Sequence, residues 1–257
     1  MTPDEVIAHL RAAGCVFAAD EAAILLASAA DDGELARLVT RRVAGEPLEA
    51  VVGWAEFGGL RVTVAPGVFV PRRRTELLVE LAVRRARRDA LVLDLCCGSG
   101  AIGAAVARRV AVRLVAADID PAAVAVARTN VRPYRGRVFQ GDLYAAVPDE
   151  LRGRIDLLLV NAPYVPSPAI ALMPPEARDH EARIALDGGP DGLDVHRRIV
   201  AEAADWLAPS GRLLIEASRE QASRTAALIR GAGLAAVVET DERRDATVVI
   251  GRPLSRS

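Results

Sequence analysis

The first 50 residues have the apolar spacing and the end signals of three helices. Thr2 and Glu5 are separated as in a capping box, and Pro3 stands at the first helical position. We therefore predict a first helix that starts here and ends at Gly14. The next two predicted helices are "EAAILLASAA" and "GELARLVTRRVAGEP", the latter closed by Gly45 and Pro47. The pattern predicts a helical domain over residues 1–50.

From Val51 the period changes to short runs rich in β-branched and aromatic residues, "VVGWAEFGGLRVTVAPGVFVP". Gly58 and Gly59 divide these runs, which is typical of a β-hairpin. We interpret residues 51–71 as a hairpin linker between the helical domain and a larger domain over residues 72–257.

After Pro71, aliphatic strands alternate with helical stretches, beginning with a helix predicted over Thr75–Arg88. The strands are almost continuously apolar, which indicates burial on both faces and hence a parallel sheet covered by helices. A further helix is predicted at about Arg219–Gly231. The predicted strands are "ALVLDL", "VRLVAAD", "RVFQGD", "IDLLLVNA", "GRLLIEAS" and "ATVVIGR".

Composition narrows the classes of protein. The chain has 33 basic and 34 acidic residues and a formal charge of −1, so no overall field attracts nucleic acid or anionic lipid. Its three cysteines fit neither a disulfide framework nor a four-ligand metal site. The N-terminus lacks a signal peptide pattern and no apolar run approaches about 18 residues. We expect a cytoplasmic protein without metal, membrane anchor or stable nucleic-acid binding.

One strand ends in a glycine turn that opens a helix, "LVLDLCCGSGAIGAAVA". Gly98, Gly100 and Gly103 give the spacing G-x-G-x-x-G, which lets the backbone approach a ligand at a helix N-terminus. Asp118 follows the next strand, 20 residues after Gly98, where a carboxylate can accept hydrogen bonds from ribose hydroxyls. The pair predicts a nucleoside cofactor; the alternative is a purely structural turn.

Asp94 immediately precedes this turn, and we expect its carboxylate in the crevice, where it would repel a pyrophosphate and favour a cationic ligand. S-adenosylmethionine is such a ligand, and the order Asp94, glycine turn, Asp118, Asp142 resembles class I methyltransferases. That resemblance implies a Rossmann-like, mostly parallel seven-stranded sheet. Asp142 has a second interpretation, as a helix cap. The resemblance implies cofactor contacts at Asp94, Cys96, Gly98, Gly100, Asp118, Ile119, Asp142, Leu143, Asn161 and Thr75.

The motif Asn161-Ala162-Pro163-Tyr164 follows the fourth strand, at the expected ligand edge of the sheet. It resembles the (Asn/Asp/Ser)-Pro-Pro-(Tyr/Phe) signature of enzymes that methylate a nitrogen conjugated to a π system. The Asn161 oxygen and a nearby backbone carbonyl would accept the two N–H bonds of that nitrogen, and Tyr164 would pack on its planar group. The alternative is an Asx-type turn with a core tyrosine. Cys96 and Cys97 we interpret as small apolar filler.

Two longer segments narrow the resemblance to the release-factor glutamine methyltransferases: "GEPLEAVVGWAEFGGLRVTVAPGVFVPRRRTELLVE" and "ALDGGPDGLDVHRRIV". The resemblance covers residues from about 44 to the C-terminus. It implies N5-methylation of a glutamine in a Gly-Gly-Gln loop of a translation termination factor. It also implies that residues 1–50 recognise the protein substrate, residues 72–257 are catalytic, and the protein is a monomer.

The chain departs from that family in four places. Ala162 replaces the first proline of the signature, which loosens the adjacent carbonyl. Arg73 and Arg74 replace a proline and an acidic residue, which makes an acidic or phosphate-bearing partner more plausible. The segment "RDHEARIAL" lacks an Arg-Phe-Glu-Pro element, and the N-terminal domain is short. These differences suggest a relative whose protein substrate differs.

Three alternatives remain. A nucleic-acid amino methyltransferase (N6-adenine or N2-guanine type) shares the chemistry of Asn161, and "PRRRTE" and "VRRARR" could touch phosphates. An NAD-dependent oxidoreductase explains the glycine turn and Asp118 but gives no role to Asn161. A non-catalytic module that binds S-adenosylmethionine is favoured only by Ala162.

Overall fold

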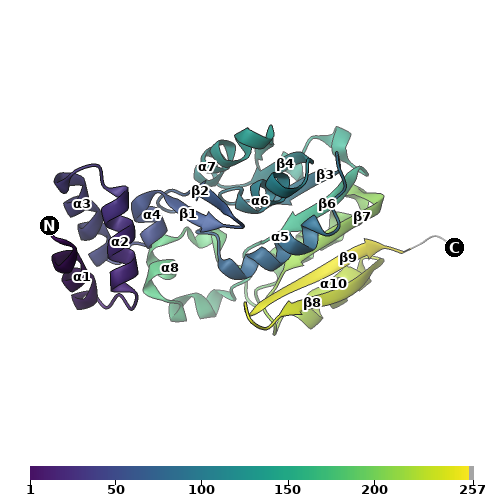
Figure 1. Cartoon of the computed structure of the whole chain (residues 1–257). Helices are drawn as coiled ribbons and strands as arrows, with labels where there is room; N and C mark the ends of the chain where they lie inside the picture. The colour runs from purple at the N-terminus through teal and green to yellow at the C-terminus, as the bar shows by residue number, and fades with distance from the viewer. Residues whose placement is uncertain (255–257) are drawn as a thin grey trace.

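The computed structural model describes residues 1–254, and the chain begins with a three-helix bundle. α1 (Pro3–Ala12) opens with the predicted capping box between Thr2 and Glu5. α2 (Ala18–Ser28) and α3 (Asp32–Val43) pack against it. Figure 1 shows this bundle at one end of the molecule, away from the sheet. The bundle has a core of its own, formed by Val6, Leu10, Ala18, Ala22, Leu25, Leu35, Leu38, Val39 and Val51.

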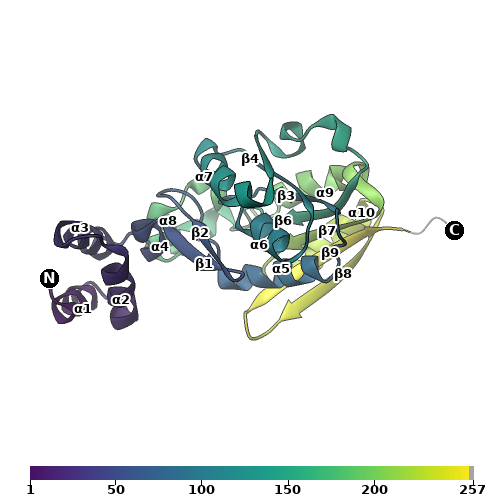
Figure 2. The same cartoon turned by 45° about the horizontal axis from the view of Figure 1, so that its top comes forward.

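The predicted hairpin follows, but it begins three residues late. Val51 and Val52, which the sequence assigns to the hairpin, complete a short helix, α4 (Leu48–Val52), because Gly53 ends that helix in a left-handed conformation. β1 (Trp54–Phe57) and β2 (Leu60–Thr63) then pair antiparallel. A Cβ atom on Gly58 would lie 2.8 Å from the Ala105 side chain, so the hairpin packs directly on the larger domain. Figures 1 and 2 show it between the bundle and the sheet.

The larger domain is built on a seven-stranded sheet, as predicted, with the order β5-β4-β3-β6-β7-β9-β8. The first five strands in that order are parallel, while β9 pairs antiparallel with both β7 and β8. The strands are β3 (Leu91–Leu95), β4 (Arg113–Asp118), β5 (Arg137–Gln140), β6 (Ile155–Val160), β7 (Leu207–Glu216), β8 (Leu234–Asp241) and β9 (Ala246–Pro253).

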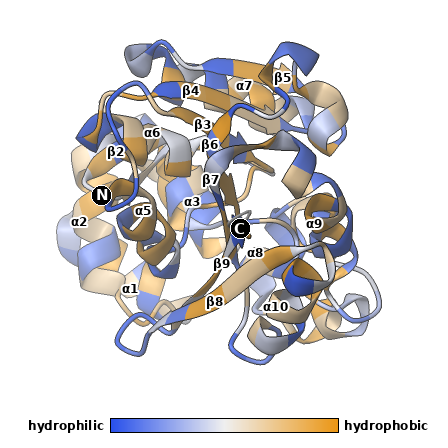
Figure 3. Ribbon diagram, turned by 90° about the vertical axis from the view of Figure 1, so that its right-hand side faces the viewer, coloured by the Kyte–Doolittle hydropathy of each residue, from blue (hydrophilic) through white to orange (hydrophobic). Residues whose placement is uncertain are grey.

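Helices cover both faces of the sheet, as Figure 3 shows from the side. One face packs against α5 (Glu76–Val83), α6 (Ala101–Arg109) and α7 (Pro121–Val131). The other packs against α9 (Asp194–Trp206) and α10 (Ala222–Gly231). These layers explain why the central strands are apolar on both sides. Short 3-10 helices occupy Arg73–Thr75, Arg132–Tyr134, Leu143–Ala146, Asp149–Leu151, Ser167–Leu172 and Arg183–Ala185.

Two further predictions differ from the structure. The predicted strands omit β8, an edge strand whose residues are mostly half-buried or exposed, so its sequence lacks a continuous apolar run. The helix predicted over Thr75–Arg88 is shorter: a 3-10 turn precedes it, and α5 ends at Val83 before a run of arginines. The predicted domain over residues 72–257 also includes residues 255–257, which lie outside the described part of the chain.

The strand order places the chain reversal at the centre of the sheet. β3 lies between β4 and β6, so the loops after β3, β4 and β6 leave the same carboxyl edge side by side. In open α/β sheets this is the crevice in which ligands bind. The long connection after β6 contains α8 (Pro175–His180), which lies beside the hairpin and α4 in Figure 2.

Candidate functional site

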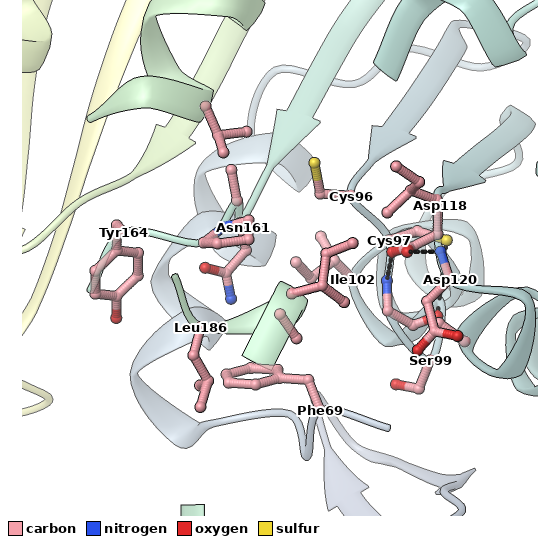
Figure 4. Close-up of a pocket in the computed structure, with 18 of the residues that line it drawn as sticks. Phe69, Cys96, Cys97, Ser99, Ile102, Asp118, Asp120, Asn161, Tyr164 and Leu186 are labelled. Carbon is pink, nitrogen blue, oxygen red and sulfur yellow. Dashed lines mark hydrogen bonds between the residues drawn. The ribbon is translucent and has the colours of Figure 1, made fainter. Parts of the chain in front are cut away.

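A cavity of about 270 Å³ opens at this carboxyl edge. The loops after β3, β4, β5 and β6 all contribute to its lining, together with the chain just before α5 and the loop around Leu186. Figure 4 shows Asp118 and Asn161 on opposite sides of it, with Cys96 and Ile102 between them. Of the residues predicted as a site, those that line the cavity are Thr75, Cys96, Gly98, Asp118, Ile119, Asp142, Leu143, Asn161, Ala162, Pro163 and Tyr164.

The three glycines of the turn have different physical roles. A Cβ atom on Gly98 would meet open space, and this residue lines the cavity, so the backbone is accessible to a ligand there. Gly100 does not line the cavity; its Cβ would lie 3.1 Å from Ala127 of α7. A Cβ on Gly103 would lie 2.7 Å from Leu114. Of the three, only Gly98 leaves its backbone open to the cavity, and the other two allow α6 to pack closely.

Asp118 is tied to the glycine turn. Its carboxylate accepts hydrogen bonds from the backbone N–H groups of Gly98, at 2.8 Å, and Asp120, at 2.9 Å. Burial raises its pKa, while these N–H groups oppose the rise. The carboxylate is thus held at the cavity wall with lone pairs left for further donors, which fits the hydroxyls of a ribose.

Apolar groups border the same region. Ile119 is 45% exposed beside Asp118, and Leu143 lines the cavity from the loop after β5. Asp142 opens the 3-10 helix there, but its side chain makes no capping hydrogen bond. It pairs instead with Arg198 of α9 at 2.6 Å. Asp142 thus occupies the N-cap position, but its side chain does not cap the helix. Two apolar surfaces near a fixed carboxylate fit an adenosine.

Asp94 lies elsewhere than expected. It is fully buried beneath the turn, does not line the cavity, and accepts a hydrogen bond from Gly103 N–H at 2.8 Å. Its second oxygen has no partner among the described residues. Burial raises its pKa to about 7, which the Gly103 N–H opposes and the charge of Asp118 reinforces. The prediction that its carboxylate points into the crevice is wrong, because the side chain faces α6 instead of the cavity.

The cysteines offer no nucleophile. Burial raises the pKa of the Cys96 and Cys97 thiols, and the neighbouring aspartates raise it further, so both stay protonated. His196 is fully buried against Thr225 and does not line the cavity. Cys96 adopts φ 58°, a left-handed conformation that costs less for glycine. Within residues 1–254, no cluster of His, Cys, Asp or Glu forms a candidate metal site.

Asn161 follows β6 and lies across the cavity from Asp118. Its Nδ2 lies 3.5 Å from the Oγ1 of Thr75, which accepts no capping hydrogen bond from α5 and is almost fully buried. Ala162 is 2% exposed and also belongs to the core between the sheet and α9. A carboxamide side chain thus stands at one wall of a cavity whose other wall carries the glycine turn.

The loop of Asn161 is held from behind by residues that the motif alone does not identify. The Tyr164 carbonyl accepts a hydrogen bond from Gln221 Nε2 at 2.9 Å. The carbonyl of Pro163 would lie 2.8 Å from a Cβ on Gly188, so only glycine allows this approach. Gly188 N–H also donates to the carbonyl of Val165 at 2.9 Å. The segment "ALDGGPDGL" therefore acts as a brace for the loop.

The arginines at the mouth are paired within the protein. Arg72 lies 2.6 Å from Glu181, whose carboxylate also accepts from Val70 N–H. Arg74 donates to the Tyr164 hydroxyl at 2.7 Å and lies 3.5 Å from Glu216. Their charges are thus compensated in part by buried carboxylates. Among the described residues, no helix is long and apolar enough to cross a membrane.

Comparison with known proteins gives relatives and a fold neighbour. Residues 59–173 match the model of the methyltransferase small domain. The chain is 42% identical over 188 residues to the release factor glutamine methyltransferase of Geobacter sulfurreducens, covering 72% of this chain and 65% of that one. The protein of the same name from Mycolicibacterium smegmatis is 43% identical over 193 residues, covering 73% and 67%.

A third relative has another name. The 4-amino-L-phenylalanine/4-methylamino-L-phenylalanine methyltransferase of Streptomyces pristinaespiralis is 40% identical over 203 residues, covering 76% of this chain and 69% of that one. Among solved structures, a 16S rRNA methyltransferase of T. thermophilus in complex with AdoMet and guanosine has a TM-score of 0.58 at 21% identity, covering 78% and 50%.

The solved structure confirms only the class I methyltransferase fold. The sequence relatives are similar enough to show the family. The match spans 65% to 67% of the first two relatives' own lengths. The identity of 43% over that span means that the chain belongs to the release factor glutamine methyltransferase family.

Proposed function

We propose that this protein transfers a methyl group from S-adenosylmethionine to the N5 atom of a glutamine side chain in a protein, and that this glutamine lies in the Gly-Gly-Gln loop of a peptide chain release factor. One observation carries the proposal: the Asn161 side chain and the Asp118 carboxylate line one cavity from opposite walls. A methyl donor and an acceptor nitrogen can therefore meet between them. The names of the relatives from Geobacter and Mycolicibacterium support the choice of acceptor.

The lining residues fit the cofactor. Asp118 would accept the ribose hydroxyls, and Gly98 leaves room for the ligand beside the backbone. Ile119 and Leu143 would contact the adenine, and Asp142, which also lines the cavity, would lie near them. When bound, S-adenosylmethionine supplies an electrophilic methyl on a sulfonium. Asp94, buried behind the turn, would act on the cofactor only through the turn that it supports.

On the acceptor side, the chemistry requires that an unreactive amide nitrogen be aligned and made more electron-rich. The Asn161 Oδ1 atom and the carbonyl of the neighbouring loop would accept its two N–H bonds, which favours the positive charge that develops on nitrogen. In-line placement can contribute about 7 kcal/mol or more, and one directed hydrogen bond about 3 kcal/mol. Tyr164 would pack on the planar amide.

Ala162 is compatible with this role. A proline would restrict φ at this position, and alanine does not. The brace and Gln221 compensate for this freedom. The Gln221 side chain donates to the Tyr164 carbonyl, and Val165 N–H donates to the Leu186 carbonyl at 3.0 Å. Because the loop is fixed from behind, its carbonyls keep a defined direction without the missing ring. This supports catalysis over a non-catalytic module.

The domains take their roles from this activity. Residues 1–50 would recognise the protein substrate, residues 51–71 would link them to the sheet, and residues 72–257 would catalyse methyl transfer. The separate core of the bundle and its place at one end of the molecule, away from the sheet, support this division. We place the activity in the cytoplasm, where release factors act, and expect a monomer.

The test uses methyl-labelled S-adenosylmethionine with a release factor, followed by mass spectrometry of the peptides. We expect label on the glutamine of the Gly-Gly-Gln loop, and a loss of kcat of about 100-fold or more in Asn161→Ala. A release factor with that glutamine replaced by alanine is the matched control. Label in nucleic acid would replace the proposal with an amino methyltransferase, and tight cofactor binding without any transfer would indicate a binding module.

A second acceptor is favoured by the relative from Streptomyces pristinaespiralis, whose name gives an aromatic amino acid amine as substrate. An aryl amine nitrogen is also conjugated, so Asn161 could serve it in the same way. Arg74 lines the cavity and has donors beyond its bond to Tyr164, which suits the carboxylate of a free amino acid. Methylation of 4-amino-L-phenylalanine, with no label on the release factor, would identify this activity.

A further inference from the structure

Glu216, the last residue of β7, is a buried carboxylate that the proposed reaction does not use. It is 2% exposed, and neither oxygen has a hydrogen-bond partner among the described residues. The nearest cation is Arg74, whose Nε lies 3.5 Å from Oε1. A carboxylate buried in this way costs several kcal/mol unless groups around it can donate. Its position next to the acceptor site suggests what those groups are.

The sheet register places Glu216 beside Asn161. Val160 of β6 pairs with Ile215 of β7, so the next residue of each strand leaves the same edge, and parallel neighbours in register point to the same face. Thr75 stands at the start of α5, which packs on that face, and its Oγ1 lies 3.5 Å from Asn161 Nδ2. Glu216 itself does not line the cavity. It can act on the acceptor only through its neighbours.

The direction of these hydrogen bonds decides which atom Asn161 presents. A carboxamide has nearly the same shape when its oxygen and nitrogen exchange places, so hydrogen bonds alone select the orientation. A threonine hydroxyl has one proton and two acceptor lone pairs. If that proton goes to a carboxylate, the hydroxyl can only accept from Asn161. The amide nitrogen then faces Thr75, and the oxygen faces the cavity.

We propose that Glu216 is a positioning residue that accepts the Thr75 hydroxyl proton and thereby fixes Asn161 with its oxygen toward the methyl acceptor. This inference rests on the proposed function. Without Glu216 the hydroxyl is free to donate to the Asn161 oxygen. The amide would then present its NH₂ group to the acceptor nitrogen. The N–H bonds of the two groups would repel each other, and the Asn161 oxygen would no longer accept from the methyl acceptor.

Donors lie around the Glu216 carboxylate and oppose the effect of its burial. Burial raises the pKa of Glu216 above its ordinary value, and Thr75, Arg74 and Tyr164 act against that rise. The Tyr164 hydroxyl accepts from Arg74 at 2.7 Å, which leaves its own proton free for Glu216. This assigns a role to Arg74, one of the departures from the family pattern: it supplies the positive charge beside a buried anion.

Kinetics of four variants test this chain of hydrogen bonds from Glu216 through Thr75 to Asn161, called the relay below. Glu216→Gln can donate to Thr75, and Thr75→Val cannot accept from Asn161, so each should lower kcat about tenfold or more. The dissociation constant of S-adenosylmethionine for Glu216→Gln should stay within about twofold. The double variant Glu216→Gln/Thr75→Val should lose no more kcat than the more impaired of the two single variants, because both residues act in one chain of hydrogen bonds. Thr75→Ser should retain kcat within about threefold.

The control is Asp156→Asn, which removes a carboxylate at the amino end of β6, far from the cavity, where it accepts from Leu91 N–H. It should leave kcat within about twofold of the wild type. The relay is overturned if Glu216→Gln keeps full kcat, or if the double variant loses the product of the two single effects. It is also overturned if Asp156→Asn loses as much as Glu216→Gln.

A second measurement needs no acceptor. The chain has two asparagines, Asn130 and Asn161, so ¹⁵N-asparagine labelling gives two side-chain amide signals in NMR. Asn130 donates to the carbonyls of Thr63 and Ser99 and is the internal reference. We expect the Asn161 signal to shift in Glu216→Gln and the Asn130 signal to stay. An unmoved Asn161 signal would contradict the relay, whereas absence of methyl transfer by the wild type would contradict only the proposed function.

Discussion

At the scale of single residues, Asp94 and Asp118 show how two carboxylates of one motif acquire different roles. Asp118 keeps an edge in the cavity and accepts two backbone N–H groups. Asp94 is enclosed, with one backbone donor and one oxygen without a partner. Both lie near the same turn, and burial separates the carboxylate at the cavity wall from the enclosed one. The difference has a consequence for stability.

The pH dependence of unfolding should report the burial of Asp94. Its pKa in the folded protein is raised to about 7 from an ordinary value of 3.8, so the folded protein binds a proton that the unfolded chain has lost. Its contribution to the free energy of unfolding therefore falls as pH rises through this window. The free energy of unfolding of the wild type minus that of Asp94→Asn should fall by up to about 1.4 kcal/mol for each unit of rising pH. Urea denaturation measures both values.

Asp156→Asn is the matched control for this prediction. The pKa of Asp156 is lowered, since hydrogen bonds from Arg87 and Leu91 N–H outweigh its burial. Its stabilising effect is present above the ordinary carboxyl range and is lost only in acid. The difference in the free energy of unfolding between the wild type and Asp156→Asn should stay constant near neutral pH. A rising difference for Asp94→Asn would mean that its carboxylate is ionised and favourably paired in the folded protein.

At the scale of elements, the important contact is between the loop after β6 and the brace that precedes α9. Gly192 has φ 74°, and a Cβ atom there would overlap the Tyr164 carbonyl and the Gln221 side chain. The two segments are 20 or more residues apart in the chain but share backbone hydrogen bonds, such as Gly188 N–H to Val165. The geometry of the acceptor site thus depends on a close backbone approach.

Gly192→Ala should therefore disturb catalysis through the loop. We expect kcat to fall about tenfold or more, because displacement of the Tyr164 carbonyl misaligns the acceptor, while cofactor affinity changes little. The control is Gly231→Ala, at the end of α10, where a Cβ meets nothing within 4 Å. That change should stabilise the fold by about 0.5 kcal/mol and leave kcat unchanged. Equal losses of kcat in both variants would contradict the role of the brace.

At the scale of the whole molecule, the N-terminal bundle is joined to the long loop that borders the cavity. Arg42 of α3 pairs with Glu21 of α2 and, at 2.8 Å, with Glu176 of α8. Figure 2 shows α8 beside α4, between the bundle and the sheet. A protein substrate held by the bundle would thus be oriented relative to the acceptor site through this contact.

Glu176→Arg should separate substrate recognition from cofactor binding. The reversed charge faces Arg42 and repels α3 from α8, so we expect the KM for the release factor to rise about fivefold with an unchanged dissociation constant for S-adenosylmethionine. Glu176 is 51% exposed, so stability should change by less than about 1 kcal/mol. Glu150→Arg, an exposed site elsewhere, is the control. A parallel loss of cofactor affinity would refute this division of roles.

The sequence predicted the fold, and most of the predicted site residues line the cavity, because both depend on local signals. Caps, glycines and apolar runs define helices and strands within a few residues, and a chain that alternates them places its strand ends on one edge. Asp118, Asn161 and the first glycine followed from that rule. Strand β8 was missed because an edge strand is not buried on both faces and so lacks a continuous apolar run. The helix α4 was missed because no capping side chain marks its start before Gly53 ends it.

The sequence by itself determined which residues reach the carboxyl edge of the sheet, since chain order and strand direction suffice for that. Only the tertiary structure decided which of them line the cavity. It turned Asp94 toward α6, paired Asp142 with Arg198, and brought Glu216 and Thr75 beside Asn161 from segments more than 50 residues away. The physical reason is that burial and hydrogen-bond direction arise from packing between distant elements, and no local pattern encodes them.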